Sequence, residues 1–237
     1  MAFNPCLLIM NPRILTEALE SIEKCVDIPV TYFRAFTEPQ VLVAINDYIK
    51  TKSNYTHYVM CGDDAIFTRK AVDCVLKYTE DESYDVFTGW MNMHIESNGS
   101  FSRESTVCFG QLPPIANEEW GPQREEYPPW VSMDTMTRYK TREKPLRTAY
   151  ANFALTGMKR EMWLKYPLMT HPRGNASDHQ LSYRLQTDGI KVWTHVDAFI
   201  THMRQGWTPM RRNWLVGNQP PEIIETQRTW GNREDYV

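Results

Sequence analysis

The sequence lacks the glycine-rich phosphate loops that mark two large classes of nucleotide-binding protein. No GxGxxG follows the first apolar segment, and no GxxxxGK followed by Ser or Thr occurs in the chain. The first absence argues against an ordinary dinucleotide-dependent oxidoreductase, and the second against a P-loop NTPase. A GxSxG turn and a paired Cys/His arrangement are also missing, so the sequence indicates neither a hydrolase serine nor a thiol nucleophile.

The number of cysteines, the length of the apolar runs and the net charge do not indicate a disulfide-rich, membrane-spanning or nucleic-acid-binding protein. Its five cysteines are an odd number without CxxC spacing, so we expect reduced thiols in a cytoplasmic protein. No apolar run approaches the roughly 20 residues of a membrane helix. Residues 1–12 hold no basic leader before an apolar stretch, so we expect no cleaved signal peptide. The net charge of -3 argues against a protein that binds nucleic acid over its whole surface.

The first ninety residues alternate between short apolar segments and segments of helical periodicity. Strands are predicted at 6–10, 29–36, 58–61 and 84–90, and helices at 12–25, 37–49 and 69–78. This order predicts right-handed crossovers and an open, mostly parallel central sheet flanked by helices, in the α/β class. Ligands bind at the carboxyl ends of the strands in such sheets. We therefore expect the chemistry in the turns after Met10, Phe36 and Cys61.

The rest of the chain is less regular. We interpret residues 98–148, rich in proline and aromatics, as short strands and long loops inserted into one domain. Helices are predicted at 159–166 and 177–187, the second ended by Gly189, and a pair of strands at 190–193 and 198–202. The tail from Arg204 is rich in Trp, Arg and Pro and poorly periodic.

Two adjacent carboxylates, Asp63 and Asp64, follow the third predicted strand directly. Carboxylate oxygens suit Mg²⁺ or Mn²⁺, and such ions are often shared with substrate phosphates. His202 ends the strand at 198–202, where a neutral imidazole can also bind a metal ion. The alternatives are a solvated turn for the two aspartates and an ordinary surface or core position for the histidine.

Asp178 lies at the start of the helix at 177–187. The pattern of Ser177 followed three residues later by Gln180 is that of a capping box, which is a structural role. Beside an open cleft, Asp178 at that helix start is also a candidate general base.

Positive charge is concentrated between Arg138 and Arg173. This stretch contains nine basic residues and only two acidic ones, Glu143 and Glu161, so its net charge is +7 and that of the rest of the chain is -10. A solvated face is one interpretation, and attraction of a diphosphate or phosphorylated acceptor is the other.

In order and spacing, three segments resemble the GT-A glycosyltransferases, most closely the inverting family 2 group. They are YVMCGDDAIFTRKAV at 58–72, ALTGMKREMWLKY at 154–166, and ASDHQLSYRLQTDGIKVWTHVDAFITHM at 176–203. Asp64 matches the final acid of that family's DxD motif, Asp178 the catalytic base, and His202 the histidine that closes the following strand. Arg184 and Gly189 match the helix arginine and the turn glycine. Gly62 replaces the first acid of the DxD, and Ser177 replaces the glutamate before the base.

The resemblance implies a single GT-A domain over 1–237, with a Rossmann-like nucleotide-sugar half at 1–95 and an acceptor half at 96–237. It implies a metal-dependent inverting transfer from a nucleotide-diphosphate sugar, a UDP-sugar above others, to an acceptor hydroxyl. Mn²⁺ or Mg²⁺ is expected at the metal ligands, and Asp178 as the base. The resemblance implies that the nucleotide is bound by Asn11, Pro12, Arg13, Phe33 and Arg34. It implies that Asp63 and Asp64 bind both the nucleotide and the metal ion, and that His202 binds the metal ion.

The acceptor side is assigned more loosely. Trp120, Tyr127 and Trp130 form an expected sugar or acceptor platform, and basic residues of the tail (Arg204, Arg211 and Arg212) an expected lid over the diphosphate. The acceptor itself stays open between a glycan, a protein side chain, a lipid-linked group and a nucleic-acid base.

Two other functions remain open. A sugar nucleotidyltransferase shares the sheet and the acidic site, but Met10-Asn11-Pro12-Arg13 offers one arginine and no glycine for a triphosphate. A non-catalytic carbohydrate- or nucleotide-binding protein on a degenerate transferase scaffold is the second, because the first acid of the DxD is absent.

Overall fold

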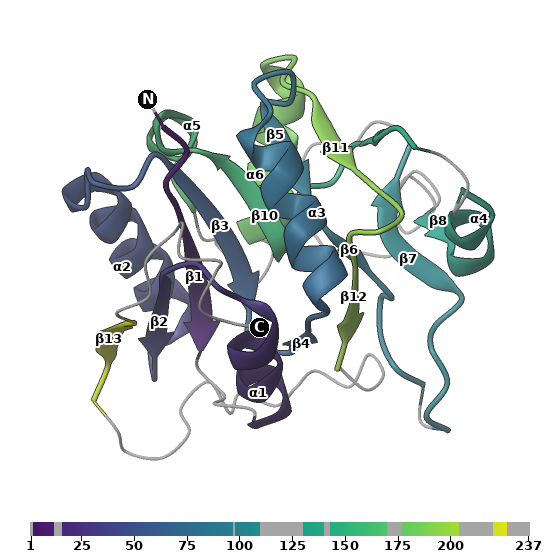
Figure 1. Ribbon diagram of the computed structural model, residues 1–237, viewed down its shortest axis with the longest axis horizontal. Helices are drawn as coiled ribbons and strands as arrows, with labels where there is room; N and C mark the ends of the chain where they lie inside the picture. The colour runs from purple at the N-terminus through teal and green to yellow at the C-terminus, as the bar shows by residue number, and fades with distance from the viewer. Residues whose placement is uncertain are drawn as a thin grey trace, which may run out of the picture.

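An eight-stranded sheet forms the centre of the protein, in the order β13-β2-β1-β3-β10-β5-β11-β9 (Figure 1). The computed structural model describes residues 2–11, 16–96, 98–109, 130–139, 143–169, 177–203 and 220–226. The strands of the sheet are β1 (Pro5–Asn11), β2 (Val30–Arg34), β3 (His57–Gly62), β5 (Val86–Thr88), β9 (Leu146–Thr148), β10 (Ala154–Lys159), β11 (Val192–Thr194) and β13 (Glu222–Glu225).

Five of the eight strands run in one direction. β1 is parallel to β2 and β3, and β11 is parallel to β5. β10 lies between β3 and β5 and is antiparallel to both, so β3 and β5 point the same way. β9 and β13 are antiparallel strands at the two edges. The predicted α/β class with a mostly parallel sheet is confirmed.

Helices cover both faces of the sheet. In Figure 1, α1 (Thr16–Cys25) and α3 (Arg69–Glu80) lie in front of it and α6 (Ser177–Thr187) behind. The helices α2 (Glu38–Thr51) and α5 (Arg160–Lys165) share the apolar cluster of α6. Leu7 and Ile9 of β1 join the core under α1 and α3, whereas Leu8 and Met10 join the core on the other face. Burial on both faces explains why this strand is apolar throughout.

Smaller sheets flank the central one. The first joins β4 (Ala65–Ile66), β12 (Phe199–His202) and β6 (Trp90–Met91), and the second joins β7 (Glu104–Cys108) and β8 (Trp130–Ser132). A short helix, α4 (Met133–Arg138), follows β8. β12 is antiparallel to β4, with His202 opposite Ala65. This pairing brings the end of β12 to the residues that follow β3.

Gly89 divides the strand predicted at 84–90 into two. β5 stays in the central sheet and β6 joins the small one. A Cβ at Gly89 would overlap the Ala154 carbonyl oxygen and lie 3.0 Å from Ile200 Cδ1, so only glycine fits this crossing. The two strands predicted at 190–193 and 198–202 exist as β11 and β12, but they belong to different sheets and do not pair with each other.

α6 ends where the sequence predicts. Gly189 has a φ of 72°, and its N–H donates to Gln186 O while Ile190 N donates to Leu185 O. This is the Schellman pattern of helix termination, with the apolar residues Ile190 and Leu185 in the same core. The expected cap at Ser177 is not tested, because the residues just before it lie outside the described part. Among the helices that the structure describes, none is both long and apolar enough to cross a membrane.

Candidate functional site

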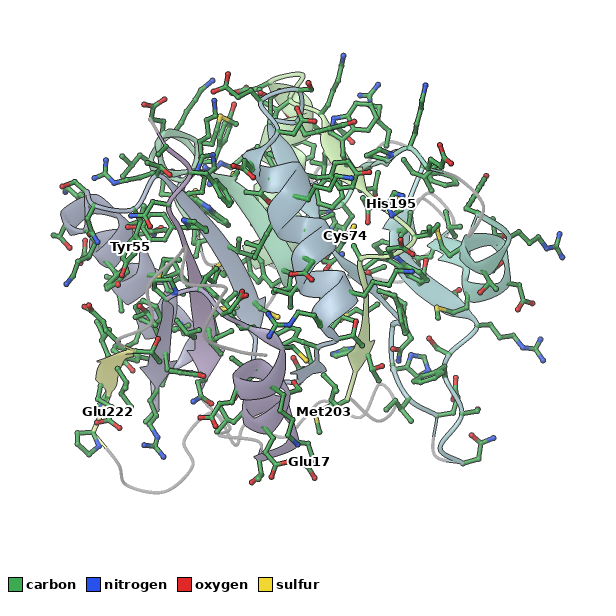
Figure 2. The ribbon with its side chains drawn as sticks, in the orientation of Figure 1. Glu17, Tyr55, Cys74, His195, Met203 and Glu222 are labelled. Carbon is green, nitrogen blue, oxygen red and sulfur yellow. The ribbon has the colours of Figure 1, made fainter. Side chains whose placement is uncertain are left out.

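Asp64 and His202 lie side by side at the carboxyl edge of β3, although 138 positions separate them in the sequence. β3 delivers Asp63 and Asp64 to this edge, and β4 then pairs with β12. The N–H of Met203, labelled at the lower edge in Figure 2, donates to the Asp64 carbonyl oxygen at 2.7 Å. The backbone pairing of β4 with β12 therefore places Asp64 and His202 close together, so that their side chains are in contact.

The imidazole of His202 is oriented by a carbonyl group. Its Nδ1 lies 2.9 Å from Met93 O, and since a carbonyl only accepts, Nδ1 carries the proton of this hydrogen bond. In the neutral ring, Nε2 then presents a lone pair to Asp64 Oδ2 at 3.1 Å. Two acceptors face each other at that distance only when a proton or a cation lies between them.

The side chain of Asn92 fixes the backbone of the same histidine. Asn92 Oδ1 accepts from His202 N at 3.0 Å, and Asn92 Nδ2 donates to His94 O at 2.8 Å. Asn92 is fully buried, so its hydrogen bonds hold the end of β12 within the fold. The side chains of His202 and Asp64 keep 9% and 16% of their surface exposed, enough for contact with a ligand.

Asp63 differs from its neighbour. It is fully buried. Within the described residues, no three His, Cys, Asp or Glu side chains lie close enough to hold a metal ion, so Asp63 is not grouped with Asp64 and His202. Its predicted role as a metal and nucleotide ligand stays a prediction.

The segment at 150–153, just before β10, links the end of β3 to the first turn of α6. Gly62 N donates to Phe153 O at 3.1 Å, and Ala151 N donates to Ser182 Oγ at 2.8 Å. Ser182 Oγ in turn donates to the Asp178 carbonyl at 2.6 Å. One short segment thus ties α6, the helix that carries Asp178, to the same edge of the sheet that carries Asp64.

The Asp178 carboxyl lies in a desolvated environment. Burial raises its pKa above the ordinary value, while hydrogen bonds from the Tyr150 hydroxyl and the His179 N–H oppose this rise. The His179 N–H lies 2.8 Å from Asp178 Oδ1. A carboxylate with a raised pKa is a stronger base near neutral pH than one in water.

A buried polar network makes the segment at 150–153 rigid. Asn152 is 1% exposed, and its Nδ2 donates to Gly89 O at 3.1 Å and to Thr106 Oγ1 at 3.0 Å. Its Oδ1 accepts from Ala154 N at 2.8 Å. Leu155, the second residue of β10, has a φ of 62° and lies at the irregularity in the β10–β3 pairing. Residues other than glycine rarely adopt this backbone conformation, and those that do are concentrated at functional sites.

The predicted nucleotide residues are distributed between core and surface. Asn11 is buried, and its carbonyl accepts from Ala35 N at 3.4 Å. Phe33 is fully buried with an edge-on ring contact of 5.6 Å to Tyr48, so its side chain belongs to the core. Arg34 pairs with Glu222 of β13 at 3.3 Å. Pro12 and Arg13 lie outside the described residues.

Two residues that the resemblance selects on α6 have structural contacts away from this edge. Arg184 Nη1 donates to Pro167 O at 2.7 Å, and its guanidinium lies 5.7 Å from the Tyr166 ring. Gly189 ends the helix. The contacts of Arg184 do not include Asp64, His202 or Asp178.

Two of the basic residues between Arg138 and Arg173, Lys159 and Arg160, lie away from the candidate site. Lys159 pairs in register with His57 at the amino end of β3 and makes an ion pair with Glu82. Arg160 donates from Nε to Ile49 O at 2.9 Å. These two lie at the sheet edge opposite Asp64, where they cannot attract a diphosphate bound at the carboxyl edge.

Of the expected aromatic platform, only Trp130 is described. Its ring contacts Tyr150 at 5.2 Å, edge to face. Trp120, Tyr127, Arg204, Arg211 and Arg212 lie outside the described residues. The sequence reasoning missed Tyr150 and Asn152; the only signal for them is their position directly before the segment 154–166.

Comparison with known proteins agrees with this arrangement at the level of the fold. No protein-family model and no curated protein matches the chain. The crystal structure of GalNAc-T7 with UDP, GalNAc and Mn²⁺ matches over 90% of this chain and 47% of that one, at 12% identity and a TM-score of 0.50. The chain has a GT-A-type fold. It spans about half the length of GalNAc-T7.

Two further solved structures are similar at lower TM-scores. A197 from STIV matches at 14% identity over 81% of each chain, with a TM-score of 0.46. Residues 1–349 of TarS from S. aureus match at 11% identity over 86% of this chain and 60% of that one, also with a TM-score of 0.46.

Proposed function

We propose that this protein is a metal-dependent inverting glycosyltransferase. It takes a nucleotide-diphosphate sugar at the carboxyl edge of the sheet and transfers the sugar to an acceptor hydroxyl. The observation that carries the proposal is the opposition of His202 Nε2 and Asp64 Oδ2, at the edge to which α6, the helix of Asp178, is also hydrogen-bonded. The GT-A-type fold supports the same choice of chemistry.

Asp64 and His202 fit a divalent cation. Their 3.1 Å separation matches two neighbouring ligand atoms of one octahedral ion, each about 2.1 Å from it. The hydrogen bond from Nδ1 to Met93 O leaves Nε2 as the coordinating nitrogen, the usual arrangement for a histidine ligand. Asp64 and His202 would hold Mn²⁺ or Mg²⁺ there, and the ion would supply positive charge against the leaving diphosphate. Its further oxygen ligands would come from the substrate, since these two side chains are the ligands that the described residues offer.

Asp178 acts as the general base. The acceptor O–H bond breaks as its proton passes to the carboxylate, and the acceptor oxygen forms a bond to the anomeric carbon. The bond between that carbon and the diphosphate oxygen breaks on the opposite face, so the configuration inverts and the nucleoside diphosphate leaves. A single displacement needs one base and a stabilised leaving group, unlike the two-carboxylate arrangement of retaining hydrolases. The raised pKa of Asp178 suits this role.

Calorimetric titration with UDP, with and without Mn²⁺, tests the metal site. UDP is the first probe because the GalNAc-T7 structure of similar fold contains it. We expect Mn²⁺ to tighten UDP binding at least tenfold in the native protein. Asp64→Asn and His202→Ala should abolish the tightening, while Asp47→Asn, on the exposed side of α2, should retain it. Equal affinity with and without Mn²⁺ in the native protein, across a panel of nucleoside diphosphates, would refute the metal assignment.

Asp178→Asn separates binding from transfer. We expect Mn²⁺-dependent nucleotide binding to be unchanged and transfer to fall by roughly 10²–10⁴-fold, the range for loss of a general base. Equal loss of both would remove Asp178 from the role of base. Tight nucleotide binding without turnover of any nucleotide sugar would favour the non-catalytic alternative instead.

A further inference from the structure

The parallel pairing of β6 with β12 ends one step before the candidate metal ligand. Its last pair places Ile200 of β12 opposite Met91 of β6. At Asn92 the chain forms a bridge to Ser105 instead, in the direction of β7. The last residue of β12, His202, therefore lies beyond the part of this strand that pairs with β6.

The side-chain amide of Asn92 takes the place of the missing strand pairing. Its Oδ1 accepts from His202 N at 3.0 Å, and its Nδ2 donates to His202 O at 3.4 Å. One amide group thus meets both backbone groups of one residue, as the backbone of a neighbouring strand would. Asparagine suits this place because its side chain carries both an acceptor and a donor. Asn92 is fully buried, so water does not compete for these hydrogen bonds.

The same amide fixes the group that orients the imidazole. Asn92 Nδ2 donates to His94 O at 2.8 Å, and Met93 N donates to the first carbonyl of β7 at 3.0 Å. Met93 is thus held on both sides, and its carbonyl oxygen accepts the His202 Nδ1 proton at 2.9 Å. With Nδ1 bonded to this carbonyl, the ring directs Nε2 to Asp64 Oδ2, 3.1 Å away.

We infer that Asn92 is a positioning residue for His202, whose amide joins the end of β12 to the Met93 carbonyl and so directs Nε2 of the imidazole to Asp64. The inference rests on the proposed function in one respect, that His202 and Asp64 bind the metal ion. Groups that orient a histidine ligand change metal affinity by roughly 10- to 100-fold without touching the ion. Asn92 acts in this way, through His202 alone.

Asn46 offers a matched control elsewhere in the fold. Its side-chain amide also spans the backbone of one residue, because Nδ2 donates to Leu168 O and Oδ1 accepts from Leu168 N, both at 2.9 Å. Asn46 lies on α2, and neither of these hydrogen bonds involves Asp64 or His202. Asn46→Ala and Asn92→Ala thus remove the same kind of amide bridge. A loss of stability alone would affect both variants in the same way.

Nitrogen-15 NMR of the histidine rings measures the orientation of His202 without a metal ion, with His202→Ala identifying its signals. We expect the Nδ1 proton to be observed in the native protein and in Asn46→Ala. In Asn92→Ala its exchange with solvent should be about tenfold faster or more, because Met93 O is no longer held against the ring. An unprotonated Nδ1 in the native protein, or an unchanged exchange rate in a folded Asn92→Ala variant, would overturn the inference.

Calorimetric titration with Mn²⁺ in the presence of UDP supplies the second readout. The affinity for Mn²⁺ should fall by about 10- to 100-fold in Asn92→Ala and stay unchanged in Asn46→Ala. Equal affinity in the native protein and Asn92→Ala would show that the ligand is oriented without this amide, and the inference would be wrong.

Asn92→Ser provides a second variant in case Asn92→Ala does not fold. It keeps a polar group in the buried space, but its one hydroxyl cannot span both backbone atoms of His202, so the same two effects are expected. Unchanged proton exchange and Mn²⁺ affinity in Asn92→Ser would contradict the inference as well. A native protein that binds no Mn²⁺ with any nucleoside diphosphate would defeat the proposed function alone, because the ring proton is measured without metal.

Discussion

Gly157, in the middle of β10, is a position where an added methyl group should destabilise the fold. It is opposite Val59 on one side and Phe87 on the other, and α3 crosses over it. A Cβ built there overlaps Thr79 Oγ1 and lies 2.9 Å from Thr79 Cγ2. Thr79 is 4% exposed and belongs to a helix packed on the sheet, so its side chain cannot simply turn away. Gly157→Ala must therefore push α3 outward, at a cost of about 1–3 kcal/mol.

A second substitution tests the cause of that cost. Thr79→Ala removes Oγ1 and Cγ2 and leaves only the Cβ, 3.1 Å from the new methyl. Within the described residues Thr79 Oγ1 has no hydrogen-bond partner, so this change alone should alter the free energy of unfolding by less than about 1 kcal/mol. In the double variant we expect at least half of the loss to return, a coupling of about 1 kcal/mol in a double-mutant cycle.

Urea unfolding followed by tryptophan fluorescence gives all four free energies. If the changes in the free energy of unfolding caused by the two substitutions simply add, the contact between Gly157 and Thr79 is not the cause of the lost stability. A Gly157→Ala variant as stable as the native protein would refute the steric reasoning altogether.

Two further predictions concern groups buried elsewhere. Asn152→Ala removes the hydrogen bonds of this side chain to Gly89 O, Thr106 Oγ1 and Ala154 N, and should cost about 3 kcal/mol in urea unfolding; an effect under about 1 kcal/mol would contradict the conclusion that this network makes the segment rigid. Burial, with the nearby Lys159 charge, lowers the pKa of His57 from 6.5 to about 4. The folded protein thus binds this proton less readily than the unfolded chain, so stability is complete above pH 6.5 and falls by up to about 3 kcal/mol as the pH drops to 4. His57→Gln should remove this part of the pH dependence, and an unchanged slope would show that other groups cause it.

The sequence predicts the first half of the fold well because each element there carries its own signal. The apolar run of β1 is buried on both faces, and the helical stripes of α2 and α3 face the sheet. β10 carries no such signal, since ALTGMK contains a glycine and lacks alternation. It is a strand because β3 and β5 both have unpaired edges at that place. Tertiary pairing of this kind is invisible to a local pattern.

The candidate site also contains some residues that the sequence predicts and others that it does not. Asp64, Asp178 and His202 emerge from motif order, and the structure brings Asp64 and His202 into contact. The resemblance implies Phe33 in nucleotide binding, yet the alternation of side chains along β2 directs it into the core. Tyr150 carries no signal in the sequence, because its ring contact with His179 joins it to a helix that begins 27 positions later.

The antiparallel insertion of β10 connects these observations. A parallel strand in its place would begin at the opposite edge of the sheet, and the residues preceding it would lie far from the carboxyl end of β3. Because β10 runs the other way, its leading segment at 150–153 begins at the very edge where Asp64 and His202 meet, and there it contacts α6. The strand that local patterns fail to predict is thus the element that ties the Asp178 helix to the edge that carries Asp64 and His202.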